Sequence, residues 1–146
     1  LKRFEPIGPE GIGDMSAPRV LVLRAPGTNC DEETAFAFDQ AGGQSDRVHI
    51  QRIVDSPKLL DAYQIVCFPG GFSFGDDIAA GRIYSTIIKA KLSDAFFSFR
   101  DRGGLILGIC NGFQVLLQTG LIVAPDPSTG QIPATLAFNS QGRFED

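Results

Sequence analysis

One cysteine lies in a sequence setting that activates thiols. The run Gly108-Ile109-Cys110-Asn111-Gly112 places glycines two residues before and two residues after Cys110. This is the spacing of a nucleophile elbow, with Cys in place of Ser. In such an elbow a strand turns sharply into a helix, and side chains at the glycine positions would collide with the backbone. The helix N-terminus favours the thiolate over the thiol, so the spacing predicts that Cys110 is a nucleophile. Several hydrolase superfamilies share this spacing.

A second glycine-rich loop follows a different predicted strand. Residues 69–77 read Pro-Gly-Gly-Phe-Ser-Phe-Gly-Asp-Asp, directly after an apolar run. Paired glycines let backbone N–H groups approach a ligand closely. An N–H near Gly71 or Phe72, together with the N–H of Asn111, would form an oxyanion hole. The residues alone fit an ordinary glycine-rich turn equally well.

The elements that must position these loops alternate along the chain. Strands are expected at 20–23, 47–50, 65–68 and 105–107. Helices are expected at about 31–41 (capped by Asn29 or Asp31), 57–63, 83–102 and 111–119. The alternation predicts an α/β fold, a flavodoxin-like doubly wound and mostly parallel sheet with helices on both faces. Ligands bind beyond the carboxyl ends of the strands in such sheets, and both glycine loops lie there.

The two ends of the chain differ from this alternating middle. Residues 1–18 are rich in Gly and Pro and are expected to form a flexible tail, which leaves 19–146 as one domain. Beyond Leu121 the sequence becomes irregular, with one weak strand expected at 135–138. No helix or strand closes the end at Asp146, so we expect the C-terminal part of the domain to be missing.

Composition narrows the class of protein. The 146 residues are 43% hydrophobic and 21% charged, an ordinary soluble composition. The net charge of −4 and the lack of a Lys/Arg run argue against nucleic-acid binding. No apolar stretch is long enough to span a bilayer, and no signal-peptide pattern is present, so we expect a cytoplasmic protein without membrane contact. The three cysteines show no paired spacing, which argues against a disulfide framework or a zinc site.

The motifs together resemble a known family. G-I-C-N-G-F-Q at 108–114 is similar to the nucleophile motif of class I glutamine amidotransferases, in which the Cys is followed by x-Gly-x-Gln. The Asn after the Cys and four further motifs resemble the glutaminases of phosphoribosylformylglycinamidine synthases, which act in purine biosynthesis. These motifs are R-A-P-G-T-N-C-D at 24–31, P-G-G-F-S-F-G-D-D at 69–77, A-A-G-R at 79–82 and G-R-F-E-D at 142–146. The resemblance covers about Arg19 to Asp146.

The resemblance implies a role for each matching residue. Cys110 would be the nucleophile, the amides of Gly71 and Asn111 the oxyanion hole, and Phe72 and Gln114 glutamine-binding residues. The implied reaction is attack on the side-chain amide of glutamine, loss of ammonia, and hydrolysis of a glutamyl thioester. Ammonia would pass to a synthetase subunit or domain, on which ATP and Mg are expected. No cofactor or metal is expected in this chain.

The family pattern is incomplete in this sequence. Its triad also contains a His and a Glu two residues apart, well after the Cys, and neither is present here. The only histidine, His49, precedes Cys110 and lies in a candidate edge strand, so we expect it to be a surface or hydrogen-bonded strand residue. The chain alone is therefore expected to be a very poor glutaminase.

The remaining reactive or charged residues have weaker claims. Cys67 is expected to be a packing residue inside a buried strand, and Cys30 a structural residue at the start of a helix. Asp76 and Asp77 lack further ligands at usable spacing, so no metal is assigned. Arg82 is expected either to be a solvated loop charge or to contact substrate or partner at the rim of the site.

Two other hypotheses remain open at this level. One is a cysteine hydrolase or glyoxalase-like protein of the wider superfamily, which also carries a Cys at a strand–helix elbow. The other is a non-catalytic regulatory module that keeps the fold and has lost the chemistry. The intact Cys110 argues against the module, and the missing His and Glu argue for it only if the natural protein also ends at Asp146.

Overall fold

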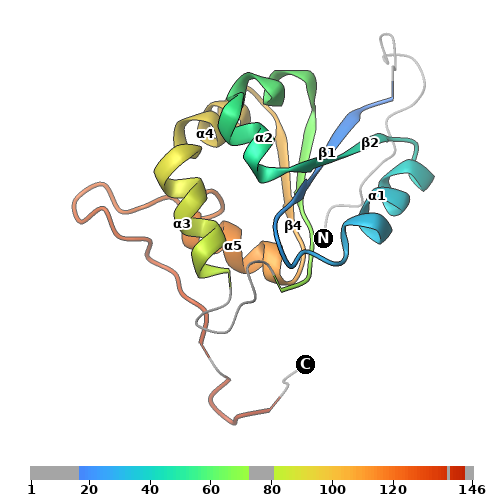
Figure 1. Cartoon of the computed structure of the whole chain (residues 1–146). Coiled ribbons are helices and arrows are strands. Elements are labelled where there is room, and N and C mark those ends of the chain that lie inside the picture. The colour runs from blue at the N-terminus through green and yellow to red at the C-terminus, as the bar shows by residue number, and fades with distance from the viewer. Residues whose placement is uncertain (1–16, 73–80, 138, 144–146) are drawn as a thin grey trace, which may run out of the picture.

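Four parallel strands form the centre of the computed structural model, which describes residues 17–72, 81–137 and 139–143 (Figure 1). The strands are β1 (Arg19–Arg24), β2 (Gln44–His49), β3 (Ile65–Phe68) and β4 (Leu105–Gly108). They pair in the order β2-β1-β3-β4, and every pairing is parallel. This order confirms the predicted flavodoxin-like, doubly wound sheet.

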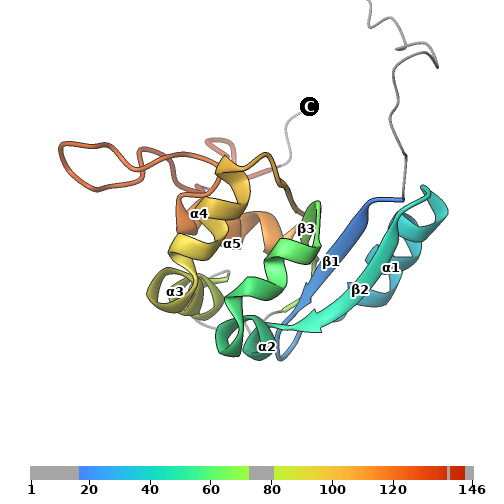
Figure 2. The same ribbon diagram turned by 90° about the horizontal axis from the view of Figure 1, so that it is seen from above.

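Helices cover the two faces of the sheet unequally. The helix α1 (Asp31–Gln40) covers one face, where Ala35 contacts Val20 and Val22 of β1. The other face carries the remaining helices (Figures 1 and 2). These are α2 (Ile50–Asp55), the 3₁₀ helix η1 (Pro57–Ala62), α3 (Arg82–Lys91), α4 (Ser93–Asp101) and α5 (Asn111–Thr119). Both faces of β1 are therefore buried, as its continuous apolar run predicts.

The main hydrophobic core lies between the sheet and these five helices. Leu21 and Leu23 of β1 and Phe68 of β3 point into it and are fully buried. Phe68 also meets the ring of Phe96 on α4, with centroids 5.4 Å apart. Burying each such side chain contributes about 1.5–3 kcal/mol, so the core fixes the strands whose carboxyl ends build the site.

Three helical expectations need correction. The single helix expected over 83–102 is two helices, because Leu92, with a φ of −131°, separates α3 from α4. The apolar spacing from Ile88 through Leu92 to Phe96 continues across the break, and these side chains are buried, so periodicity could not reveal it. Ile50, the last residue of the strand expected at 47–50, is instead the first residue of α2. The helix expected over 57–63 is a 3₁₀ helix.

Three further expectations concern the N-terminal tail, the weak C-terminal strand and membrane-spanning helices. Residues 1–16 of the expected tail lie outside the described residues, and Pro18 accepts a hydrogen bond from the Gln44 N–H at 2.9 Å. The weak strand expected at 135–138 is wrong over 135–137, because these exposed residues pair with no described strand. Phe138 lies outside the described residues. Among the described residues, no helix has the length and apolar character needed to cross a membrane.

Candidate active site

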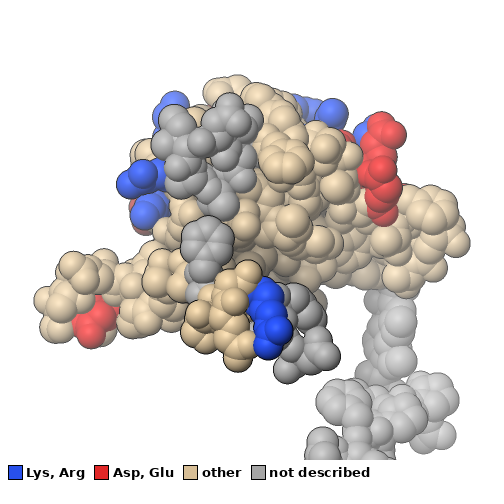
Figure 3. Space-filling model, turned by 90° about the horizontal axis from the view of Figure 1, so that it is seen from below, with Lys and Arg blue, Asp and Glu red and all other residues tan. Residues whose placement is uncertain are grey.

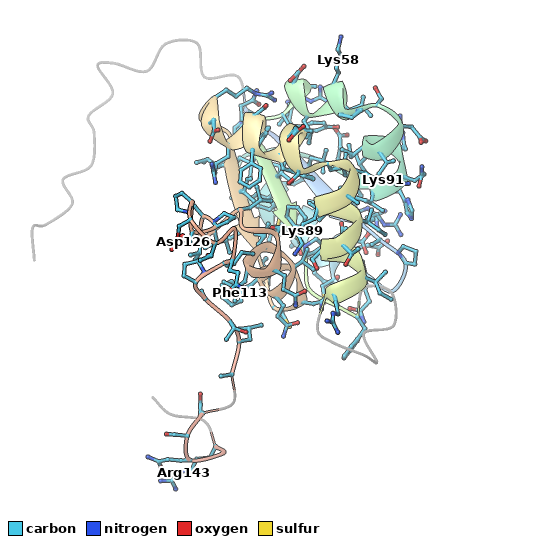
Figure 4. All side chains as sticks on the ribbon, turned by 90° about the vertical axis from the view of Figure 1, so that its left-hand side faces the viewer. Lys58, Lys89, Lys91, Phe113, Asp126 and Arg143 are labelled. Atoms are coloured by element: carbon cyan, nitrogen blue, oxygen red, sulfur yellow. The ribbon has the colours of Figure 1, made fainter. Side chains whose placement is uncertain are left out.

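Three loops meet at the carboxyl edge of the sheet. β1 and β3 are neighbours although β2 separates them in the chain, which makes the gap between them the topological switch point. Thr28 after β1 forms an antiparallel bridge with Gly71 after β3, and the Phe72 N–H donates to the Gly27 carbonyl at 3.1 Å. Figure 3 views the molecule from this edge. The switch point is therefore closed by two loops that hydrogen-bond to each other.

The third loop is the elbow that carries Cys110. Its φ of 51° and ψ of −114° make Cys110 the sole non-glycine residue with positive φ in the described part of the chain. Such backbone strain amounts to about 1–3 kcal/mol and concentrates at functional sites. Cys110 is exposed and occupies the N-cap position of α5, where the helix dipole is positive. The structure thus gives Cys110 the conformation that the spacing predicts.

The glycines on either side of Cys110 are sterically required. A Cβ on Gly108 would lie 2.6 Å from the Leu116 side chain and 2.9 Å from the Phe113 N. A Cβ on Gly112 would overlap the Phe68 carbonyl of β3. Because both contacts are with packed core or backbone atoms, the turn can form only where these two positions lack side chains. The predicted elbow is present.

Gly71 has the backbone geometry of a candidate oxyanion amide. Its φ is 127°, and a Cβ there would lie 2.7 Å from both the N and the Oδ1 of Asn29. The Phe72 N–H is already bonded to Gly27, whereas no described residue accepts a hydrogen bond from the Gly71 N–H. Of the two amides weighed from the sequence, the structure favours Gly71. Its role as an oxyanion donor stays a prediction.

The other predicted site residues lie close to the elbow. Asn111 is the first residue of α5, directly after the cysteine, and its side-chain N–H₂ donates to the Gln114 Oε1 at 3.1 Å. Gln114 is partly buried, and Phe72, in the segment that follows β3, exposes 66% of its surface. The structure therefore places these residues at one edge of the sheet, and their contacts with a substrate stay predictions.

The loop after β1 is anchored by a buried carboxylate. Asp31 is 4% exposed and lies 2.7 Å from the Arg24 Nε and 3.2 Å from the Arg47 Nη1. The expectation that Asn29 or Asp31 caps α1 is wrong, because Cys30 occupies the N-cap position without a capping side-chain bond. Asp31 joins β1, β2 and α1 at the point where the loop enters the site.

Cys30 reaches the site, which the sequence reasoning did not anticipate. A Cβ on Gly70 would lie 3.4 Å from the Cys110 Cβ and 3.7 Å from the Cys30 Sγ. The Cys30 thiol is exposed and donates to the Asn29 Oδ1 at 3.3 Å. Because no elbow motif surrounds Cys30 in the sequence, the sequence predicts only a structural role for it. Its position after a strand bordering the switch point is the signal that identifies it.

Other candidate residues have no part in this cluster. His49 is exposed and its Nδ1 accepts a hydrogen bond from the Gln51 N–H at 3.2 Å, which caps α2 and confirms the expectation of a satisfied surface residue. Cys67 is fully buried, and burial raises the pKa of its thiol to about 12, as befits a packing residue. Arg82 is exposed at the start of α3, and its expected contacts stay a prediction. Asp76 and Asp77 lie outside the described residues.

No metal centre is visible in the described part of the chain. Residues 17–72, 81–137 and 139–143 contain no group of three or more His, Cys, Asp or Glu side chains placed to hold an ion.

A doubly wound parallel sheet with a cysteine elbow after β4 and a glycine loop after β3 has the class I glutamine amidotransferase-like fold. The chain belongs to the CobB/CobQ-like glutamine amidotransferase domain family, which matches residues 17–146. The chain is 47% identical over 131 residues to phosphoribosylformylglycinamidine synthase subunit PurQ of Dehalococcoides mccartyi, covering 90% of this chain and 51% of the relative. It is 44% identical over 128 residues to subunit PurQ of Methanococcus maripaludis, covering 88% of this chain and 47% of the relative.

A solved structure shows the same relationship in three dimensions. A chain of the PurLQS structure from Thermotoga maritima aligns with a TM-score of 0.61 and 35% identity, covering 73% of this chain and 46% of that chain. The present chain thus spans about half the length of the curated relatives it matches.

Proposed function

We propose that this chain is the nucleophile-bearing part of a glutaminase that serves phosphoribosylformylglycinamidine synthase in purine biosynthesis. The observation that carries the proposal is the strained elbow of Cys110 at the N-terminus of α5, beside the glycine loop that follows β3. The similarity to relatives named as PurQ subunits supports the choice of this enzyme over other cysteine hydrolases.

The first chemical step is attack of the Cys110 sulfur on the side-chain amide carbon of glutamine. Negative charge develops on the amide oxygen, and the N–H groups of Gly71 and Asn111 are the donors we assign to it. Removing one such donor in a comparable hydrolase slows the reaction by about 2.7–4 kcal/mol in barrier height. Ammonia leaves as the thioester forms, and water then releases glutamate and regenerates the thiol.

The glycine loop would hold its amide ready before substrate arrives. Phe72 is fixed by its bond to the Gly27 carbonyl, and Thr28 bridges Gly71. A donor that is already oriented needs no reorganisation when the oxyanion forms, which is why such sites lower the barrier. Phe72, in the segment after β3, and Gln114, in the first turns of α5, are the residues we assign to holding the glutamine.

The ammonia would be consumed elsewhere. We assign the ATP- and Mg-dependent conversion of an amide to an amidine to a synthetase partner. The names of the PurQ relatives describe a subunit of that synthase, and the aligned Thermotoga maritima structure is of PurLQS. A cytoplasmic location follows from this proposed role.

General-base catalysis is the step that these 146 residues do not supply. The sequence contains one histidine, and His49 caps α2 through its Nδ1. Transfer of the thiol proton and protonation of the leaving amine require a positioned base. We therefore propose that residues 1–146 alone are nearly inactive as a glutaminase.

Ammonia release from glutamine tests this proposal. The comparison uses the 146-residue chain, a chain extended with the C-terminal segment that its longer relatives carry, and Cys110→Ala in both. Loss of a triad member costs several powers of ten, so we expect the extended chain to be faster by at least about a hundredfold. Equal rates for the two chains, both abolished by Cys110→Ala, would show that a base lies within these residues. His49→Ala would then identify or exclude His49.

A further inference from the structure

The thiol of Cys30 and the Cβ of Cys110 both lie close to Gly70, and both cysteines are exposed. Cys30 ends the loop after β1, Cys110 forms the elbow after β4, and Gly70 lies between them after β3. The position of a Cβ on Gly70 is 3.4 Å from the Cys110 Cβ and 3.7 Å from the Cys30 Sγ. Because Gly70 has no side chain, its own side-chain position is vacant at the point where the two cysteines converge.

The loop geometry gives Cys30 a defined place at this point. Its thiol donates to the Asn29 Oδ1 at 3.3 Å, and the same oxygen would be 2.7 Å from a Cβ on Gly71. A disulfide requires Cβ atoms about 3.5–4.5 Å apart, so forming one would draw Cys30 and Cys110 together through the space beside Gly70.

We propose that Cys30 is a resolving thiol for Cys110, so that a hydroperoxide converts the pair into an intramolecular disulfide. In the first step the Cys110 thiolate attacks the hydroperoxide, its O–O bond breaks, and the products are Cys110 sulfenic acid and an alcohol or water. In the second step the Cys30 sulfur attacks the sulfenic sulfur, forming the S–S bond and releasing water. The two cysteines lose two electrons in total, and the peroxide accepts them.

The third cysteine does not compete for this chemistry. Cys67 is fully buried in β3, and burial raises the pKa of its thiol to about 12, so its thiolate is scarce at neutral pH. Formation of the disulfide depends on where Cys30 and Cys110 lie, and it does not require glutaminase activity. Its consequence, reversible blocking of the nucleophile, rests on the proposed function.

Peroxide treatment followed by non-reducing peptide mapping tests the proposal. The expected product is a Cys30–Cys110 linked peptide within one molecule, with the loss of two hydrogen masses, reversed by dithiothreitol. In Cys30→Ser, which keeps a donor for Asn29, the link is lost and Cys110 proceeds to sulfinic and sulfonic acid. Cys67→Ala is the matched control and keeps the link. A link to Cys67, a link only between molecules, or overoxidation of Cys110 in the unaltered protein would overturn the proposal.

Gly70→Ala tests the geometry without removing a sulfur. The added methyl makes ordinary contacts of 3.4 Å with the Cys110 Cβ and 3.7 Å with the Cys30 Sγ, so the fold tolerates it, and it occupies the space beside both residues. Misplacing reacting groups by about 1 Å can slow a positioned reaction about 10²-fold, so we expect disulfide formation at least about tenfold slower. A thermal melt checks folding. Disulfide formation at the rate of the unaltered protein would contradict the assignment. Because no glutamine is present, this outcome is independent of the glutaminase test.

Discussion

The two edges of the sheet expose opposite kinds of surface. On the edge strand β2, Asp46 accepts hydrogen bonds from Arg19 at 2.7 Å and from the Tyr63 hydroxyl at 3.0 Å, and Arg47 pairs with acidic residues of α1. On the edge strand β4, Leu105 and Leu107 are 64% and 44% exposed. Charged side chains on an edge strand discourage further pairing, whereas apolar ones invite it.

The difference concerns the strand that carries the nucleophile. Ile106 of β4 faces the main core, while Leu105 and Leu107 lie on the opposite face, in register with Ile65 and Cys67 of β3. Within the described residues, β4 is therefore covered on one face only. At its carboxyl end, by contrast, the elbow is locked against β3 by Gly112. The comparison separates the open strand body, where Leu105 and Leu107 are exposed, from the tightly packed turn that holds Cys110.

Gly112→Val would test the locked end of β4 and should have the largest effect. The side chain would overlap the Phe68 carbonyl, so either β3 or α5 must move. We expect a loss of more than about 4 kcal/mol in unfolding free energy, in the range of severe core disruption, and loss of thiol labelling at Cys110. Denaturant unfolding measures the first and peptide mapping the second. Gly130→Asn, at a positive φ with open space around it, is the control. An unchanged melt and normal labelling in Gly112→Val would show that the elbow is misassigned.

Replacing the two exposed leucines of β4 would test the open strand body. We expect the 146-residue chain to self-associate through this edge, and Leu105→Lys with Leu107→Lys to shift it toward the monomer. Sedimentation velocity at several concentrations measures the shift, and the change in unfolding free energy should stay within about 1 kcal/mol. Ile83→Lys, at a similarly exposed apolar residue of α3, is the matched control. Equal association of the double variant and the unaltered chain would contradict the contrast between the edges.

Asp46→Asn would test the charged edge and should have the smallest effect. The hydrogen bond from Arg19 is the main cause that lowers the pKa of Asp46 below 3.8 in the folded state. A lowered pKa stabilises the fold above pH 3.8, and this stabilisation is lost as the pH falls through the folded-state value. Because both side chains are nearly half exposed, we expect less than about 1 kcal/mol. Urea unfolding of the two proteins at pH 7 and at pH 3 measures it. A difference that grows as the pH falls would contradict the assignment.

The sequence predicted the elements that rest on strong local signals. The strands expected at 20–23, 65–68 and 105–107, the end of α5 at Gly120 and the elbow of Cys110 are confirmed, because apolar runs and paired glycines leave few alternatives. The strand expected at 47–50 is present but shifted, because β2 spans Gln44–His49. The exposure of one face of β4 could not be predicted from its sequence. Its apolar run resembles that of β1, and only the sheet order shows that β4 lies at an edge.

The expectations that failed depend on contacts between distant segments. The break at Leu92 does not disturb apolar spacing, and the start of α2 is fixed by the His49 side chain. The convergence of Cys30 with Cys110 arises because β1 and β4 both flank β3, with Gly70 at the meeting point. No local pattern around Cys30 encodes that arrangement.

Competitive labelling of the three cysteines tests the central claim most directly. A glutamine-like chloroketone is added to the purified protein with and without glutamine, and the modified cysteines are mapped by mass spectrometry. The account predicts modification of Cys110 ahead of Cys30, although both thiols are exposed, no modification of buried Cys67, and protection of Cys110 by glutamine. Equal modification of Cys30 and Cys110, or labelling that glutamine does not slow, would contradict the assignment of Cys110 as a glutaminase nucleophile.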